Sequence, residues 1–291
     1  MKIDLQAVGT LGSGLTRPEG VMACDDGSVF AADAYGRCAH IRPDGQTVFF
    51  GNIGGLPNGI CIDPDGNCIV ANIGNGELQC VTPEGAHTLL MTHADGKRMF
   101  TPNFPFRDFA GRLWVSNSTD NPDIDASLRA PVPDGCLVLL APGEVPRIVA
   151  SGICFANGVA LDEKEQHVYV AETMKRRVLR YRIIDGNQLG PAEVYGPDFL
   201  GKMGFPDGIA FDEAGNLWVA FPAANSIGYI NPQGNLEMYL EDPQGAVLKR
   251  PANICFGGTD RRTAFIGSLA GTNIACFEVP YPGQRLVHQN L

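Results

Sequence analysis

The sequence has little positive charge and lacks long apolar runs. Of its 291 residues, 22 are Lys or Arg and 32 are Asp or Glu, so the formal net charge is −10. Nucleic acids and anionic membrane surfaces both attract basic patches, and the composition therefore argues against either as a partner. No apolar run approaches the roughly 18 residues of a membrane-spanning helix, and residues 1–10 do not resemble a secretory leader. We expect a cytoplasmic protein that acts on a small molecule.

Several catalytic signatures are also missing. The sequence has no Gly-x-Ser-x-Gly elbow and no Gly-rich loop between a strand and a helix, which disfavours an α/β-hydrolase and a nucleotide enzyme. Its five His are predicted to lie at the surface in turns or outer strands, which disfavours a Ser-His-Asp triad. The nine Cys form no Cys-x-x-Cys pair and are interpreted as buried small hydrophobes in a reducing compartment, with a catalytic thiol as the lesser alternative.

What the sequence does contain is one short phrase repeated along its length. This blade phrase places an acidic or amide residue after Pro or Ala, and four of its copies end in Gly. The six copies are Pro18-Glu19-Gly20, Pro57-Asn58-Gly59, Pro102-Asn103-Phe104, Ala156-Asn157-Gly158, Pro206-Asp207-Gly208 and Pro251-Ala252-Asn253. The steps between their first residues are 39, 45, 54, 50 and 45 residues. Units of ~40–50 residues with short strands and Gly turns are typical of β-propeller blades.

The repeat predicts an all-β fold, a six-bladed β-propeller that forms a single domain over residues 1–291. To close the ring, residues 3–8 are expected to pair into the last blade beside residues 275–279. An open solenoid is less favoured because polar end caps are not evident. The third unit is lengthened by residues 117–134, which are expected to form a lid over one face, with plain surface decoration as the alternative.

The position of the blade phrase predicts a metal site. Innermost propeller strands run along the central axis, so Glu19, Asn58, Asn103, Asn157 and Asp207 are expected to face one another across one mouth of the channel. Ca²⁺ takes about 6–8 oxygen ligands of this kind, whereas zinc prefers His and Cys. The alternative is that the phrase only supplies a turn before each inner strand.

Longer stretches around the same residues carry a family resemblance. They are Arg17-Pro18-Glu19-Gly20, Asn103, Phe155-Ala156-Asn157-Gly158, Phe205-Pro206-Asp207-Gly208 and Ala171-Glu172-Thr173. Over nearly its whole length the chain resembles the family of senescence marker protein, gluconolactonase and luciferin-regenerating enzyme. The resemblance implies a six-bladed propeller and a calcium-dependent hydrolase, with Zn²⁺, Mn²⁺ or Mg²⁺ as alternative ions. It implies that Glu19, Asn157 and Asp207 bind the metal and that Asn103 contacts metal or substrate.

Two positions depart from this family. Many of its sugar lactonases carry Arg where this chain has Thr101, and often Asp where it has Phe104. Both changes remove polar groups that could hold sugar hydroxyls. We therefore predict that Asn103, Thr101 and Phe104 bind substrate, and that the substrate is a sugar lactone or a less hydroxylated lactone or ester, with Phe155 and Phe205 nearby.

The resulting hypothesis is divalent-metal-dependent lactone hydrolysis with Asp207 as the catalytic residue. The cation would polarise the carbonyl group, and Asp207 would either deprotonate the attacking water or only orient it. The alternatives are a phosphotriester or fluorophosphate hydrolase on the same site, a non-catalytic binding propeller and, more distantly, a strictosidine-synthase-like enzyme. Glu172 is expected to form structural charge pairs with Arg177 and Arg180 on neighbouring strands, with a polar contact near the pocket as the alternative. No pattern in the sequence indicates an oligomeric state.

Overall fold

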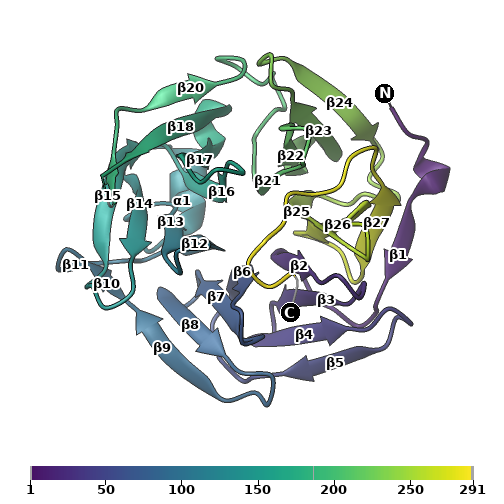
Figure 1. The fold of residues 1–291 in the computed structure, drawn as a ribbon, viewed down its shortest axis with the longest axis horizontal. Coiled ribbons are helices and arrows are strands. Elements are labelled where there is room, and N and C mark those ends of the chain that lie inside the picture. The colour runs from purple at the N-terminus through teal and green to yellow at the C-terminus, as the bar shows by residue number, and fades with distance from the viewer. Residues whose placement is uncertain (1, 186, 290–291) are drawn as a thin grey trace.

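The computed structural model describes residues 2–185 and 187–289 and confirms the six-bladed β-propeller. Six antiparallel sheets are arranged in a ring around a central axis (Figure 1). From the innermost strand outward, the first blade consists of β2 (Val21–Ala23), β3 (Val29–Asp33), β4 (Arg37–Ile41) and β5 (Thr47–Phe50). The second blade consists of β6 (Pro57–Ile62), β7 (Cys68–Asn72), β8 (Glu77–Val81) and β9 (His87–Met91). The third blade consists of β12 (Pro102–Arg107), β13 (Leu113–Asn117), β14 (Gly135–Leu140) and β15 (Arg147–Ile153).

The last three blades follow in chain order and complete the ring. The fourth blade consists of β16 (Ala156–Leu161), β17 (His167–Glu172) and β18 (Arg177–Ile184), with β19 (Gln188–Leu189) and β20 (Glu193–Tyr195) both paired to β18. The fifth blade consists of β21 (Ile209–Phe211), β22 (Leu217–Phe221), β23 (Ser226–Ile230) and β24 (Leu236–Glu241). The sixth blade consists of β25 (Pro251–Gly257), β26 (Thr263–Ser268), β27 (Ile274–Glu278) and β1 (Gly9–Leu11). The remaining elements are a ribbon of β10 (His93–Ala94) and β11 (Lys97–Arg98), helix α1 (Ile124–Arg129), and the 3₁₀ turns η1 (Leu5–Ala7), η2 (Thr173–Lys175) and η3 (Pro222–Ala224).

The ring closes between the two ends of the chain, as expected, but with different N-terminal residues. Strand β1 pairs antiparallel with β27, so that Gly9 lies opposite Cys276 and Leu11 opposite Ile274. The expected strand at residues 3–8 is wrong, because this stretch contains the 3₁₀ turn η1. The Asp4 carboxylate caps that turn by accepting a hydrogen bond from the Gln6 backbone N–H at 2.8 Å, a local contact that competes with strand pairing.

A repeated Asp forms the hairpin between the two innermost strands of several blades. In the second blade, the Asp63 carboxylate accepts hydrogen bonds from the backbone N–H groups of Asp65 and Asn67, both at 2.9 Å. In the third and fifth blades, Asp108 and Asp212 make equivalent turns. Each also accepts a hydrogen bond at 2.9 Å from the indole N–H of a buried Trp on the next strand, Trp114 and Trp218 respectively. The Asp63–Asn67 segment is thus a hairpin turn between β6 and β7.

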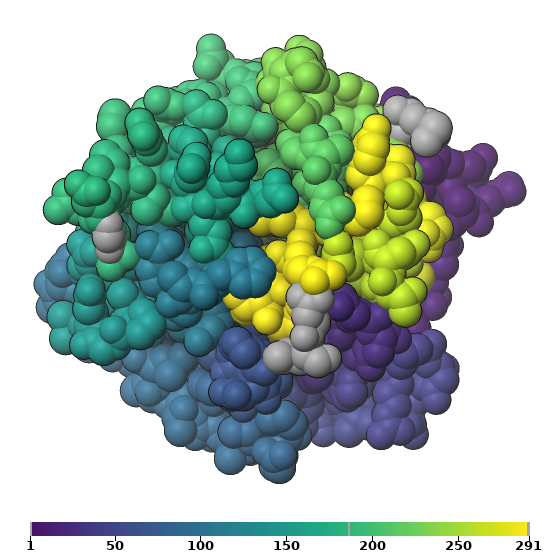
Figure 2. All heavy atoms as spheres, in the orientation of Figure 1, coloured from purple at the N-terminus to yellow at the C-terminus, as the bar shows by residue number. Residues whose placement is uncertain are grey.

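The C-terminal tail crosses the far mouth of the channel, opposite the starts of the inner strands (Figures 1 and 2). It touches the ends of those strands: the Gln284 side-chain amide donates to the Leu161 carbonyl at 3.2 Å, and the His288 Nε2 lies 2.9 Å from the Ala23 carbonyl oxygen. His288 is only 7% exposed, so its expected surface position is wrong. In the described part of the chain, no helix has the length and apolar character needed to cross a membrane.

Candidate active site

A cavity of about 590 Å³ opens at the mouth where the innermost strands begin. Its base is lined by the middle residues of five blade phrases, which are Glu19, Asn58, Asn103, Asn157 and Asp207. All five residues are buried, with at most 6% of the residue surface exposed. Residues that lie far apart in the sequence are therefore brought together at the centre of the ring, as their repeat position predicted.

Irregular strand pairing accompanies three of these cavity residues, Asn58, Asn103 and Asn157. In four blades the blade phrase falls within the innermost strand, at a point where the strand register shifts: Pro57/Ile60, Pro102/Phe104, Ala156/Val159 and Pro251/Asn253. A β-bulge of this kind inserts an extra residue and turns the local side chains away from the regular alternation. In these four blades the phrase is therefore more than a turn before a strand, whereas in the first and fifth blades it directly precedes β2 and β21.

The Gly that ends the phrase allows adjacent blades to touch at the axis. A Cβ atom on Gly20 would lie 2.2 Å from the Asn58 carbonyl oxygen, and one on Gly158 would lie 2.4 Å from the Asp207 carbonyl oxygen. Both oxygens belong to the backbone of the next blade along the chain, and this backbone cannot move without disturbing the packing of the blade. Each Gly thus sets the distance between two of the cavity residues.

Glu19 is held by the residues around it. Its carboxylate forms an ion pair with the Arg17 guanidinium and accepts a hydrogen bond from the Asn58 amide at 2.6 Å. Arg17 also donates to the Asn58 side-chain oxygen at 3.1 Å. The Glu19 carboxylate is consequently fixed in orientation at the base of the cavity.

Asn157 is oriented by a residue that the sequence reasoning had noted only as part of the family-like motif Ala171-Glu172-Thr173, with no site role. The Asn157 amide nitrogen donates to the Thr173 hydroxyl at 3.2 Å, and that hydroxyl donates to the Pro206 carbonyl at 2.8 Å. Because the Thr173 proton is used by Pro206, the hydroxyl must accept from Asn157. The other end of the amide, its oxygen, remains available as a ligand.

Asp207 and Asn103 complete an arrangement of oxygen atoms that suits a hard cation. Burial, and then the nearby negative charge of Glu19, raise the pKa of Asp207 well above its ordinary value, while Arg17, a hydrogen bond from Asn157 and Arg250 oppose the rise. The Asn103 side-chain oxygen is buried without a hydrogen-bond partner. Two crowded carboxyl groups and an unpaired amide oxygen at one point fit a divalent cation with oxygen ligands.

The cysteine thiols lie away from the cavity. None of the nine Cys lines this cavity, and burial raises the pKa of several, that of Cys136 to about 12. Within the described residues, no three His, Cys, Asp or Glu side chains cluster in a way that could hold a metal. The candidate site therefore depends on amide oxygens as well as on its two carboxylates.

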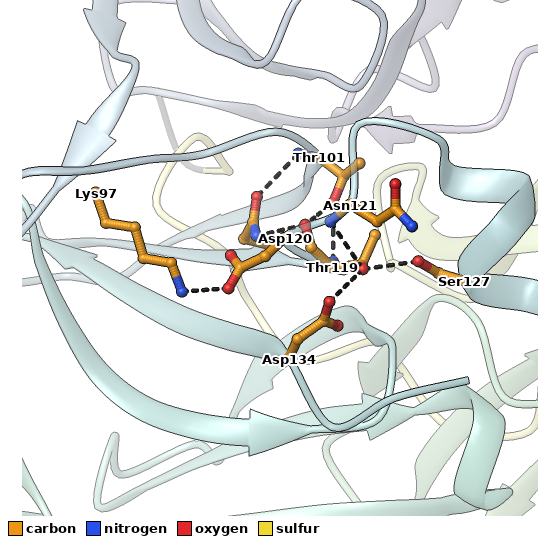
Figure 3. A network of polar contacts seen from close by, with 8 residues as sticks. Lys97, Thr101, Thr119, Asp120, Asn121, Ser127 and Asp134 are labelled. Carbon is orange, nitrogen blue, oxygen red and sulfur yellow. Dashed lines mark hydrogen bonds and ion pairs between the residues drawn. The ribbon is translucent and has the colours of Figure 1, made fainter. Parts of the chain in front are cut away.

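Residues 117–134, which we call the lid segment, reach the cavity. Helix α1 lies within this segment, and Ile124, Asp125 and Leu128 on it line the cavity wall. Figure 3 shows how the segment is anchored: the Thr119 hydroxyl contacts Ser127 at 2.7 Å and Asp134 at 2.9 Å, while Asp120 pairs with Lys97. The segment is thus part of the cavity wall and not simply surface decoration.

A comparison of the sequence with known protein families matches residues 84–270 to the SMP-30/gluconolactonase/LRE-like region. The chain belongs to this family. The match covers more than half of the chain and confirms the resemblance noted from the sequence. It includes Asn103, Asn157 and Asp207, whereas Glu19 lies before its start.

Curated relatives of this chain bear two kinds of name. A strictosidine synthase-like protein 6 from Arabidopsis thaliana is 30% identical over 177 residues, 59% of this chain and 46% of that protein. A 6-deoxy-6-sulfogluconolactonase from Pseudomonas putida is 28% identical over 165 residues, 56% of this chain and 50% of that protein. The chain spans about half the length of these curated relatives.

Solved structures of family members share the fold. A luciferin-regenerating enzyme has a TM-score of 0.78 at 21% identity, covering 98% of this chain and 99% of that one. A calcium-binding regucalcin from Agrobacterium tumefaciens has a TM-score of 0.74 at 15% identity, covering 96% of this chain and 97% of that one. At these identities the similarity shows the propeller fold alone.

Within the family-like region, the residues predicted to bind substrate divide into two groups. Asn103 lines the cavity, as do Phe155 and Phe205. Thr101 does not line it, because its hydroxyl donates to the Thr119 carbonyl at 2.8 Å. Phe104 lies one residue beyond Asn103 and lines a separate small cavity between the inner strands, beside Gln284 and Leu286 of the C-terminal tail. The structure thus does not bring Thr101 and Phe104 to the predicted site.

The predicted charge pairs of Glu172 are correct in one case of two. Its carboxylate accepts a hydrogen bond from the Arg177 guanidinium at 2.6 Å and another from the Cys154 backbone N–H at 2.8 Å. Arg180 pairs instead with Glu193 on strand β20. Successive residues of a strand alternate between its faces, so Arg177 and Arg180 point to opposite sides of β18.

Proposed function

We propose that the protein hydrolyses lactones with a divalent cation held by Glu19, Asn157 and Asp207. The observation that carries the proposal is the convergence of buried oxygens from separate blades at the base of a 590 Å³ cavity. Membership of the SMP-30/gluconolactonase/LRE-like family and the sulfogluconolactonase relative support lactone hydrolysis. The oxygen-only ligand set favours Ca²⁺, as does the description of the regucalcin neighbour, with Zn²⁺, Mn²⁺ and Mg²⁺ as alternatives.

The residues around the site have separate roles in this proposal. When bound, the cation would act as a Lewis acid, which polarises the lactone carbonyl and stabilises the negative charge that develops on its oxygen. Asp207 orients the attacking water and takes up its proton at the carboxylate. Arg17 and Asn58 hold Glu19 in place, Thr173 turns the Asn157 oxygen toward the cavity, and the Asn103 amide contacts the substrate.

A panel of lactones tests the proposal. Purified protein is treated with EDTA, assayed, and assayed again after addition of Ca²⁺, Mn²⁺, Zn²⁺ or Mg²⁺, while bound ions are measured by elemental analysis. We expect EDTA to abolish hydrolysis and one of the ions to restore it. Activity that persists in the chelated, metal-free protein would contradict the metal site. Phosphotriester and fluorophosphate substrates are assayed in parallel, and a preference for them would replace lactone hydrolysis as the reaction.

The variant Asp207→Asn tests the role of the carboxylate. It should lower kcat by about 10²–10⁴-fold because a proton acceptor is removed while the side-chain shape is kept. The matched control is Asp198→Asn, since Asp198 is exposed and does not line the cavity. Near-normal turnover by Asp207→Asn, with bound metal still present, would remove Asp207 from the chemical step.

A further inference from the structure

The repeat that supplies the oxygens also supplies a second set of cavity residues. The residue immediately before the blade phrase lines the cavity in five blades. These residues are Arg17, Leu56, Phe155, Phe205 and Arg250. Each stands two positions before the middle residue of its blade phrase, and in four blades that middle residue carries a side-chain oxygen and lines the same cavity.

The backbone is strained at three of these five positions. Arg17, Phe155 and Arg250 have φ angles of 48°, 67° and 42°, in the left-handed region that non-Gly residues seldom occupy. Such conformations cost free energy and persist where the surrounding structure requires them, often at ligand sites. The shared geometry indicates that the wall of the cavity is built by the fold.

One side of this wall is apolar. Leu56, Phe155 and Phe205 come from the second, fourth and fifth blades, and Met174 on η2 lies next to them in the lining. Together with Ile124 and Leu128 on helix α1, these residues form what we call the apolar arc. The two arginines come from the first and sixth blades, which adjoin each other on the other side of the ring (Figure 1).

The apolar arc is held in position by its neighbours. The Arg176 guanidinium lies 4.2 Å from the centre of the Phe205 ring. On α1, Ile124 and Leu128 are four residues apart and share a helix face, while the buried Ser127 ties the helix to Thr119 (Figure 3). Leu128 is nonetheless 41% exposed, so an apolar surface at the cavity remains open to solvent.

Polyhydroxylated substrates match this wall poorly. A sugar hydroxyl placed against Leu, Ile, Met or Phe side chains loses water without gaining a hydrogen-bond partner. The arc offers no side-chain donors, and Thr101, at the equivalent place in the third blade, is used by Thr119. An alkyl or aryl group placed there would instead cover apolar surface, and each buried methylene would increase affinity about threefold to fourfold.

We propose that the lactone substrate carries an apolar alkyl or aryl substituent, which binds against the apolar arc beneath helix α1. This inference rests on the proposed function, in which the lactone ring is opened at the oxygen-lined base of the cavity. It adds that the substituent, and not ring hydroxyls, supplies most of the recognition. Arg17 is held by Glu19 and Asn58, and Arg250 is exposed at the rim, so neither contributes to the arc.

A series of six-membered lactones tests this inference. Glucono-δ-lactone, δ-valerolactone, δ-octalactone and δ-decalactone share one ring and differ in hydroxyl groups or alkyl length. With the active metal, kcat/KM should rise at least tenfold from δ-valerolactone to δ-decalactone, and glucono-δ-lactone should be the poorest of the four. A flat series, or a preference for glucono-δ-lactone, would overturn the inference while leaving lactone hydrolysis in place.

Unreactive lactams separate this inference from the proposed reaction. Calorimetry should show that the pentyl-substituted δ-lactam binds at least tenfold more tightly than the unsubstituted δ-lactam. If no lactone is hydrolysed but this binding preference is found, the proposed reaction is wrong and apolar recognition stands. If neither hydrolysis nor the binding preference is found, both proposals are wrong.

Leu128 provides the matched variant. Leu128→Ala should lower the ratio of kcat/KM for δ-decalactone to that for δ-valerolactone by about threefold to tenfold, because it removes part of the arc. The control is Val132→Ala, which also shortens an exposed aliphatic side chain of the lid segment but lies outside the cavity lining. If this ratio of kcat/KM values is the same in both variants and in the wild type, the substituent does not bind against the apolar arc and the inference is wrong.

Discussion

At the scale of single residues, the hydroxyl of Thr173 determines which end of the Asn157 amide faces the cavity. It accepts from the amide nitrogen and donates to the Pro206 carbonyl, so that one small side chain links the fourth and fifth blades. Thr173 has no charge and is not part of the blade phrase. Only the three-dimensional structure reveals its position relative to the oxygens.

The variant Thr173→Val should weaken binding of the active cation about 10–100-fold, because the Asn157 amide loses the hydrogen bond to Thr173 that helps to fix its orientation. Calorimetric titration of the metal-free protein measures the change. Thr263→Val is the control, since Thr263 also loses a side-chain hydrogen bond, to Glu278, but lies far from the cavity lining. Equal affinities in both variants would leave Thr173 with a structural role only.

His288 makes a separate prediction about pH. Burial lowers its pKa below the ordinary value of 6.5, opposed by the Ala23 carbonyl and by Asp25. The unfolded chain therefore binds a proton more readily than the folded one, and the contribution of His288 to stability is present above about pH 6.5 and is lost as the pH falls. Urea unfolding should show that the free energy of unfolding decreases less between pH 7.5 and pH 5.5 for His288→Gln than for the wild type. Identical decreases would contradict this account.

At the scale of structural elements, the bulged inner strands combine ring packing with site geometry. The middle residue of the blade phrase supplies a side-chain oxygen, the Gly that ends the phrase makes the contact between blades, and the residue before the phrase lines the cavity wall. Because one short motif does all three, a change in blade spacing also changes the candidate site.

The variant Gly158→Ala tests this coupling. Its Cβ would overlap the Asp207 carbonyl, and we expect a loss of about 1–3 kcal/mol in the free energy of unfolding. Gly190→Ala is the control, because its Cβ would meet no atom closer than 3.6 Å and its φ is not in the left-handed region. Urea denaturation compares the two. Equal stability would show that the blades can separate without cost.

The elements could be predicted from the sequence to different extents. The blade phrase located all six blades, since Asp turns and Gly contacts recur at fixed offsets. The N-terminal strand was misplaced because Ile3, Leu5 and Ala7 alternate as in a strand, although Asp4 caps a 3₁₀ turn there. Phe104 was misassigned because the bulge at Pro102/Phe104 changes the side on which the next side chain lies.

At the scale of the whole molecule, the short strand β1 joins the N-terminal part of the chain to β27 in the last blade. A Cβ atom on Gly9 would lie 3.4 Å from the Cys276 sulfur, and the two residues are opposite each other in the register. The variant Gly9→Cys should therefore form a disulfide under oxidising conditions that joins the two ends of the chain.

This cross-link should stabilise the protein by about 2–4 kcal/mol because it closes a long loop in the unfolded chain. Thermal unfolding with and without dithiothreitol measures the gain, and thiol titration should show two fewer free thiols after oxidation. Gly9→Ser is the control, since it adds a side chain of similar size that cannot cross-link. A variant that keeps all its thiols would show that β1 does not remain beside β27.

The C-terminal tail determines how a reaction in this ring would proceed. It covers the ends of the inner strands opposite the cavity, so a lactone and the hydroxy acid formed from it would share a single opening. Ring opening converts a neutral molecule into an anion, which would leave a cavity lined in part by the exposed Asp125 of the lid segment. Each product molecule thus occupies the route that the next substrate needs, and product inhibition should be competitive.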